Sequence, residues 1–114
     1  MSQHRGLLTF AADIPPALED DFNRWYEEEH IPERLAVPGF LRACRYRALV
    51  GSPKYLAVYE VTSPGVFDSA EYLHFLKGAG ETEWTKRVLA ACTNKSRNLY
   101  VKISERHADR KSVG

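Results

Sequence analysis

Hydrophobic and polar positions follow two different periods along the chain. Short runs rich in β-branched and aromatic residues predict strands at residues 6 to 12, 40 to 49, 54 to 61 and 94 to 104. Apolar residues spaced three and four apart predict helical segments at residues 17 to 30, 67 to 77 and 82 to 91. Clusters of proline, glycine and serine separate these segments and predict turns.

The order of these elements is β-α-β-β-α-β, with Gly78-Ala79-Gly80 interrupting the second helical segment. This order predicts a ferredoxin-like α+β sandwich, in which the helices cover one face of a four-stranded antiparallel sheet. A chain of 114 residues is expected to form one domain, here residues 1 to 104, followed by a flexible tail at residues 105 to 114.

The first predicted helix carries a core stripe and then meets a proline. Leu18, Phe22 and Trp25 recur at i, i+4 and i+7 and share one face. Pro32 disfavours helical geometry at Ile31, so the regular helix is expected to end or kink there, with a further short turn of helix after it.

The strand at residues 54 to 61 is apolar on both faces. Its alternate positions are Tyr55, Ala57, Tyr59 and Val61 on one side and Leu56, Val58 and Glu60 on the other. Two helices cover only one side of a sheet, so the other side would expose a large apolar patch. A second copy of the chain is the simplest cover, which predicts a homodimer through the open sheet face. The alternative is that the tail or the loops cover it.

Charge and composition exclude several classes of function. The net charge of +1 provides no field that would attract nucleic acid or an anionic membrane, and no apolar run reaches the roughly 20 residues of a membrane span. The N-terminus lacks the pattern of a signal peptide, and no phosphate-binding or nucleophile motif is present. Cys44 and Cys92 are expected to be free thiols in the cytoplasm, with a disulfide or a reactive thiol as the alternative.

Residues 22 to 46, FNRWYEEEHIPERLAVPGFLRACRY, contain the main candidate for chemistry. His30 is predicted to lie at a helix C-terminus, which favours the cationic imidazolium and suits a proton-transfer role. The structural alternative is that His30 caps carbonyls at the helix end. Glu29 falls on the core face and must find a partner or stay protonated.

Arginines on the following strand are candidate anchors for an oxyanion. Alternation places Arg42 on one face with Phe40 and Tyr46, and Arg45 on the other. A guanidinium turned inward would hold a carboxylate, enolate or phenolate oxygen, and Arg97 on the last strand is a similar case. The alternative for these arginines is ion pairing with nearby glutamates.

Several aromatic residues are expected to line a cavity beside His30, or else simply to pack in the core. They are Tyr26, Tyr46, Tyr59, Tyr72 and Trp84. His74 lies on the second predicted helix, and His30, Glu29 and His74 could in principle converge on a metal ion. No ligand-spacing motif supports that set, so neither a metal nor a cofactor is expected. A basic stripe with interleaved aromatics is also missing, which argues against nucleic-acid binding.

The segments WYEEEHIPERLAVPGF, RACRYR, KYLAVYEV, FDSAEYLHFL, EWTKRV and KSRNLY together resemble the dimeric α+β barrel superfamily. Within it, residues 5 to 103 look most like the EthD-like proteins. The superfamily includes muconolactone isomerases, cofactor-free polyketide monooxygenases, cyclases, haem-degrading oxygenases and members without assigned activity. The resemblance therefore implies the fold more than a reaction.

Three functions are carried forward from the sequence. The first is a cofactor-independent isomerase or cyclase acting on a small aromatic or polyketide-like carbonyl compound, with His30 moving the proton and Arg45 or Arg97 stabilising the oxyanion. The second, implied by EthD-like proteins, is a non-catalytic accessory protein that binds a hydrophobic metabolite or a partner oxygenase. The third, implied by the haem-degrading members of the superfamily, which use a helix histidine as the iron ligand, is a haem-dependent oxygenase with His74 as that ligand.

Overall fold

The computed structural model describes residues 4–76 and 81–109. Its strands are β1 (Gly6–Asp13), β2 (Phe40–Arg47), β3 (Tyr55–Val61) and β4 (Thr93–Val101). Its α-helices are α1 (Glu19–Trp25), α2 (Ile31–Leu35), α3 (Ala70–Leu76) and α4 (Glu83–Ala91). Short 3₁₀ turns precede α1 (Pro16–Leu18) and α3 (Pro64–Asp68), and a π-helical turn, Tyr26–His30, joins α1 to α2.

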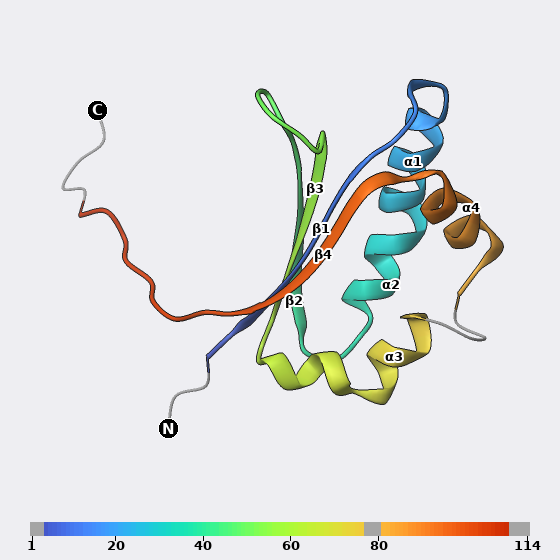
Figure 1. Ribbon diagram of the computed structural model, residues 1–114. Coiled ribbons are helices and arrows are strands. Elements are labelled where there is room, and N and C mark those ends of the chain that lie inside the picture. Colours follow the sequence, from blue (N-terminus) through green and yellow to red (C-terminus); the bar gives the residue numbers. More distant parts are fainter. Residues whose placement is uncertain (1–3, 77–80, 110–114) are drawn as a thin grey trace.

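The strands form one antiparallel sheet in the order β2-β3-β1-β4. Figure 1 shows the helices gathered on one side of this sheet, with no helix on the other. The predicted β-α-β-β-α-β order and the ferredoxin-like α+β sandwich are therefore confirmed. The predicted glycine interruption at residues 78 to 80 lies outside the described residues, as do the last five residues of the predicted tail.

The helix after β1 does not stop at Pro32. Ile31 has helical torsion angles, φ −63° and ψ −47°, and α2 continues through the proline to Leu35. The change in geometry comes one turn earlier, where the N–H of Ile31 donates to the carbonyl of Tyr26, five residues back. A proline ring normally clashes with the carbonyl four residues before it, and the wider π turn gives that carbonyl room.

Strand β2 changes face near its start. Phe40 is paired with Val61, but the next paired residue, Arg42, already faces Glu60, so Leu41 lies in a bulge. Phe40 is buried under the helices, whereas Arg42 and the residues that alternate with it point to the opposite face. The prediction that Phe40 shares a face with Arg42 was therefore wrong, because strict alternation does not anticipate an extra residue.

The turn before β2 depends on a glycine. Gly39 has φ +97°, a conformation that side chains with a Cβ rarely adopt, and a Cβ there would lie 2.4 Å from the side chain of Val66. Since the carbonyl of Gly39 also accepts from the N–H of Thr62, this turn ties the end of α2 to the end of β3. The helix that carries the candidate residues is thus held against the sheet.

The helices cover one face of the sheet and leave the other face exposed. Aromatic and aliphatic residues between the sheet and the helices form the core, including Trp25, Tyr59 and Val61. On the other face Tyr46 is 55% exposed and Tyr100 51%. Residues 103–109 are exposed and lead away from the sheet (Figure 1), so the described part of the tail does not cover this face. No helix within the described ranges is long and apolar enough to span a bilayer.

Candidate functional site

A cavity of about 110 Å³ lies between the sheet and the helices. Its walls are mostly aromatic and aliphatic, with two arginines and one histidine among them. The lining residues are Leu8, Phe10, Trp25, Tyr26, His30, Arg34, Tyr59, Tyr72, Leu76, Leu89 and Arg97. They come from three strands, from α1, α2, α3 and α4, and from the π turn, so only the folded chain brings them together.

The π turn decides where His30 points. In a regular α-helix, residues five apart point about 140° away from each other. The i→i+5 bond of the π turn instead brings Trp25 and His30 onto the same side, where their rings stack with centroids 4.3 Å apart. The imidazole also meets the edges of Tyr26, at 5.3 Å, and Tyr59, at 6.1 Å.

This aromatic surrounding reverses the electrostatic prediction for His30. Burial disfavours the charged imidazolium, and the nearby Arg34 guanidinium adds to this, so the pKa of His30 lies well below its ordinary value of 6.5. The helix continues beyond His30, so both predictions that depended on a helix end, a stabilised imidazolium and a carbonyl cap, were wrong. His30 is a neutral base at physiological pH.

Arg34 is the most unusual polar group in the cavity. The residue is only 6% exposed, and its Nε and Nη1 atoms are buried without a hydrogen-bond partner. Its guanidinium lies over the ring of Tyr72, 5.5 Å from the centroid. Burial lowers the pKa of Arg34 from 12.5, although an arginine remains protonated at any physiological pH. The cavity thus contains a positive charge that no described carboxylate balances by an ion pair.

Three tyrosines contribute hydroxyl groups. The Tyr59 hydroxyl is buried and makes no hydrogen bond of normal geometry, although the Tyr26 phenol is close enough to influence its pKa. Burial raises the pKa of both phenols well above 10, so both are neutral. The Tyr72 hydroxyl accepts from Arg97 Nη2 at 2.5 Å, which leaves its own proton available to a ligand.

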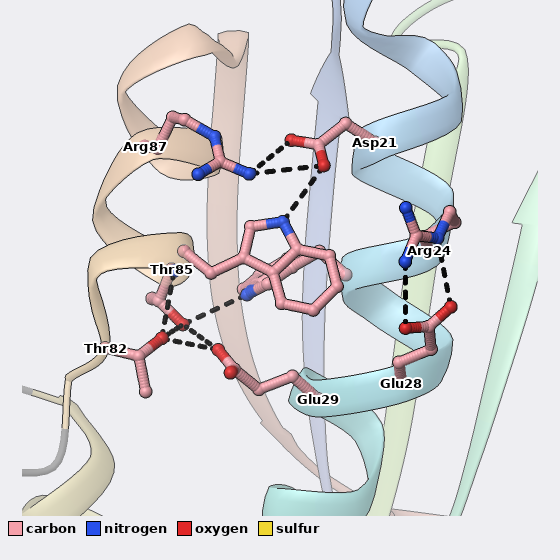
Figure 2. Close-up of polar contacts among 9 residues, drawn as sticks. Asp21, Arg24, Glu28, Glu29, Thr82, Thr85 and Arg87 are labelled. Carbon is pink, nitrogen blue, oxygen red and sulfur yellow. Dashed lines mark hydrogen bonds and ion pairs between the residues drawn. The ribbon is translucent and has the colours of Figure 1, made fainter.

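A polar cluster outside the cavity fixes Trp25, and Figure 2 shows it. Trp25 Nε1 donates to Thr85 Oγ1 at 3.0 Å, and that hydroxyl donates to Glu29 Oε2, also at 3.0 Å. Thr82, the N-cap of α4, donates to the same carboxylate oxygen at 2.5 Å. The prediction that Glu29 needs a partner is confirmed, and the partner holds the indole on which His30 stacks.

Arg45 does not reach the cavity. Arg45 is not among the residues that line it. Its guanidinium lies 4.4 Å from the centroid of Tyr26 and donates to Asn23 at 2.6 Å and to Glu27 at 3.0 Å. Arg42 forms an ion pair with Glu60 at 3.2 Å on the open face. The structural alternative, ion pairing, therefore describes both arginines, while Arg97 alone of the predicted arginines lines the cavity.

Two predicted cavity aromatics lie elsewhere. Tyr46 is on the open face of the sheet, because the bulge at the start of β2 shifts the alternation. Trp84 packs between α4 and α1, where its Nε1 donates to Asp21 at 3.1 Å (Figure 2). The cavity does contain Tyr26, Tyr59 and Tyr72, as the sequence predicts.

His74 is also separate from the cavity. It lines a shallow hollow between α2 and α3 together with Ala36, Val37, Ala70 and Glu71. Among residues 4–76 and 81–109, no three histidine, cysteine, aspartate or glutamate side chains come together as a metal site, so His30, Glu29 and His74 do not converge. Cys44 and Cys92 are free thiols, of which Cys92 is buried.

Sequence reasoning missed Arg34, and the reason is specific. A helix that ends before Pro32 leaves Arg34 in a short exposed turn. A helix that continues places His30 and Arg34 at i and i+4, on one face. That spacing was a readable signal, but it becomes meaningful only once the π turn lets the helix pass the proline.

Comparisons with known proteins identify the fold. Neither a scan against models of protein families nor a search of curated proteins finds a match. A dimeric ferredoxin-like protein from an uncultured marine organism has a solved structure that superposes with a TM-score of 0.66, at 16% identity over 95% of each chain. SnoaB, a cofactor-independent oxygenase from Streptomyces nogalater, gives 0.62 at 16% identity over 92% of this chain and 97% of that one.

A heme-degrading protein from Mycobacterium tuberculosis is similar to the same extent, with a TM-score of 0.66 at 14% identity over 94% of this chain and 100% of that one. At such identities the likeness shows the shared fold alone. The chain therefore has the ferredoxin-like α+β fold found in these proteins, and its chemistry must be argued from its own cavity.

Proposed function

We propose that the chain is a cofactor-independent enzyme that moves a proton on a small carbonyl compound, in an isomerisation or cyclisation. The observation that carries this proposal is a neutral imidazole, His30, beside the buried guanidinium of Arg34 in a mostly apolar cavity. A neutral imidazole can accept a proton, and nearby positive charge stabilises the anion that forms.

In the proposed step, the bond between hydrogen and the carbon next to the carbonyl breaks, and the proton moves to the imidazole of His30. The electron pair moves to the carbonyl oxygen and gives an enolate. The Tyr72 hydroxyl, polarised by Arg97 at 2.5 Å, is placed to donate to that oxygen. Where the substrate has a double bond next to the acidic carbon, the enolate extends over it, and return of the proton from His30 to the far carbon of that double bond completes an isomerisation. Arg45 has no part in this step, because Asn23 and Glu27 already hold it.

The volume of the cavity limits the size of the substrate. An apolar cavity of about 150 Å³ accommodates benzene, and the cavity here is about 110 Å³. The substrate in this proposal is therefore a single ring or a short chain, and a polycyclic compound would have to extend beyond the lining residues.

The EthD-like resemblance supports a second candidate, a non-catalytic protein that binds the same kind of compound. The cavity itself favours it through the buried, unpartnered groups of Arg34 and Tyr59, which suit binding whether or not a reaction follows. Haem fits less well, since a cavity of about 110 Å³ takes one ring and not four, and His74 lines a different hollow.

Exchange of hydrogen for solvent deuterium, at the carbon next to a carbonyl, tests the enzyme directly. The assay screens small lactones and cyclic ketones by NMR. His30→Ala should lower the exchange rate about 10²–10⁴-fold, while His74→Ala, the matched histidine outside the cavity, should retain it. Undiminished exchange in a folded His30→Ala protein removes His30 from the mechanism. Saturable binding without exchange favours the accessory protein.

We further propose that a second copy of the chain covers the open sheet face. Tyr46, Leu56 and Tyr100 are 55%, 36% and 51% exposed there, which is unusual for a monomer. The marine ferredoxin-like protein is described as dimeric, which supports this arrangement. Sedimentation should give twice the 13.0 kDa chain mass, and Leu56→Glu should dissociate it. A monomer at micromolar concentration contradicts the proposal.

A further inference from the structure

The charge of Arg34 is buried and forms no ion pair within the described part of the chain. The residue is 6% exposed, its Nε and Nη1 atoms lack partners, and within the described ranges no carboxylate forms an ion pair with it. Glu33, its neighbour in the chain, attracts the guanidinium but forms no ion pair with it, and burial outweighs that attraction and raises the pKa of the Glu33 carboxyl group. An isolated buried charge is costly, and natural proteins retain one chiefly where a function uses it.

The surroundings of Arg34 keep the guanidinium in the cavity. One side lies over the ring of Tyr72 at 5.5 Å, and Tyr59 presents a second buried group without a partner. The Tyr59 hydroxyl is neutral and can donate a hydrogen bond. Two unsatisfied donors from different elements, α2 and β3, therefore line the same small space.

We infer that the cavity binds a compound that already carries one negative charge, a small monocarboxylate whose oxygens accept from Arg34 and Tyr59. A carboxylate matches the planar guanidinium and brings the single charge that balances it. The rest of the ligand, one ring or a short chain, would occupy the aromatic part of the cavity. This inference names the substrate class of the proposed function, since a keto acid would place its carboxylate on Arg34 and its acidic carbon toward His30.

The test measures binding and not turnover. Benzoate, cyclohexanecarboxylate and propanoate are titrated into the full-length protein at neutral pH and compared with their amides, which have nearly the same shape and no charge. At least one acid should bind saturably and at least about tenfold more tightly than its amide. In Arg34→Met the preference for the acid should disappear. In Arg24→Met, a matched exposed arginine paired with Glu28, it should remain.

The inference is overturned if no acid binds saturably at millimolar concentration, if the amides bind as tightly as the acids, or if Arg34→Met keeps the preference. If Arg34→Met fails to fold, the affinities of the wild-type protein for the acids and for their amides still decide the question. If the protein binds the acids more tightly than the amides but catalyses no deuterium exchange, the anion site is supported and the proposed enzyme activity is contradicted. If the protein catalyses deuterium exchange on neutral ketones but binds acids and amides equally, the enzyme activity is supported and the anion site is contradicted.

Discussion

Arg45 and Arg34 both lie over tyrosine rings on the helix-covered side of the sheet, and they differ in what surrounds them. Arg45 lies 4.4 Å from the centroid of Tyr26, and Asn23 and Glu27 accept its hydrogen bonds. Arg34 lies 5.5 Å from the centroid of Tyr72, and its buried Nε and Nη1 atoms have no partner. The first arginine is satisfied by its own chain, and the second is not.

The difference separates a structural charge from a functional one. Asn23 and Glu27 satisfy Arg45 within the fold, so its charge contributes to stability without a ligand. Arg34 gains nothing comparable from the fold, so its charge is expected to lower stability until a ligand binds. Residue type alone does not distinguish the two, whereas the count of unsatisfied donors does.

Replacing each arginine by methionine should give the largest contrast. Arg45→Met removes two hydrogen bonds to polar partners and a cation–π contact, and should lower the free energy of unfolding by about 3 kcal/mol. Arg34→Met replaces an unpaired buried charge by an apolar side chain and should leave that free energy unchanged or raise it. Urea denaturation of both variants checks this. Equal destabilisation by the two substitutions would show that Arg34 is also a structural charge.

Two glutamates, Glu29 beside the cavity and Glu28 on the surface, extend the comparison. Glu29 accepts from Thr82 and Thr85 and so holds Trp25 under His30, whereas Glu28 is paired with Arg24 on the surface. Glu29→Ala should lower the free energy of unfolding by about 2 kcal/mol, and Glu28→Ala by less than about 1 kcal/mol. Near-UV circular dichroism should change only in Glu29→Ala, because only that variant releases Trp25. A similar loss in both variants would contradict the role given to Glu29.

The pH dependence of stability extends the comparison to His30. The unfolded chain binds a proton at His30 near pH 6.5, whereas the folded chain resists it, because its pKa there is lowered. Acid therefore favours unfolding, and stability falls as the pH drops below 6.5, by at most about 1.4 kcal/mol per pH unit for one group. The free energy of unfolding continues to fall until the pH reaches the pKa of His30 in the folded chain.

Two variants check this assignment by urea denaturation across the same pH range. His30→Gln should show a flatter profile below pH 6.5, because it removes the titrating group. Arg34→Met should shorten the range of the loss, because the guanidinium no longer opposes protonation of His30. Parallel profiles for the wild type and His30→Gln would show that other groups cause the dependence.

Much of the fold was readable from the sequence. Glycine and proline clusters mark the turns, and the runs between them have the period of strands or helices, which was enough for the topology. The apolar character of both faces of β3 was also readable. Tyr26, Tyr59 and Tyr72 were identified as cavity residues because aromatic rings form walls and phenols donate hydrogen bonds, although the same reasoning also named Tyr46 and Trp84.

The details that place the site were not readable, and each has a local cause. The π turn brings Trp25 and His30 together at a spacing that a helical wheel separates. The bulge at Leu41 reverses the face of the residues after it and so removes Tyr46 from the cavity. Both features insert one extra residue into a regular repeat, and a pattern based on regular periods cannot locate such an insertion.

The most direct test of the anion site is to determine which residues a bound carboxylate contacts. Nuclear Overhauser effects between benzoate ring protons and the protein report that position even for weak binding. Effects to the rings of His30, Tyr59 and Tyr72, which disappear in Arg34→Met, are the result expected here. Effects to Tyr46 or Tyr100 on the open face instead, or the same pattern in Arg34→Met, would contradict the account.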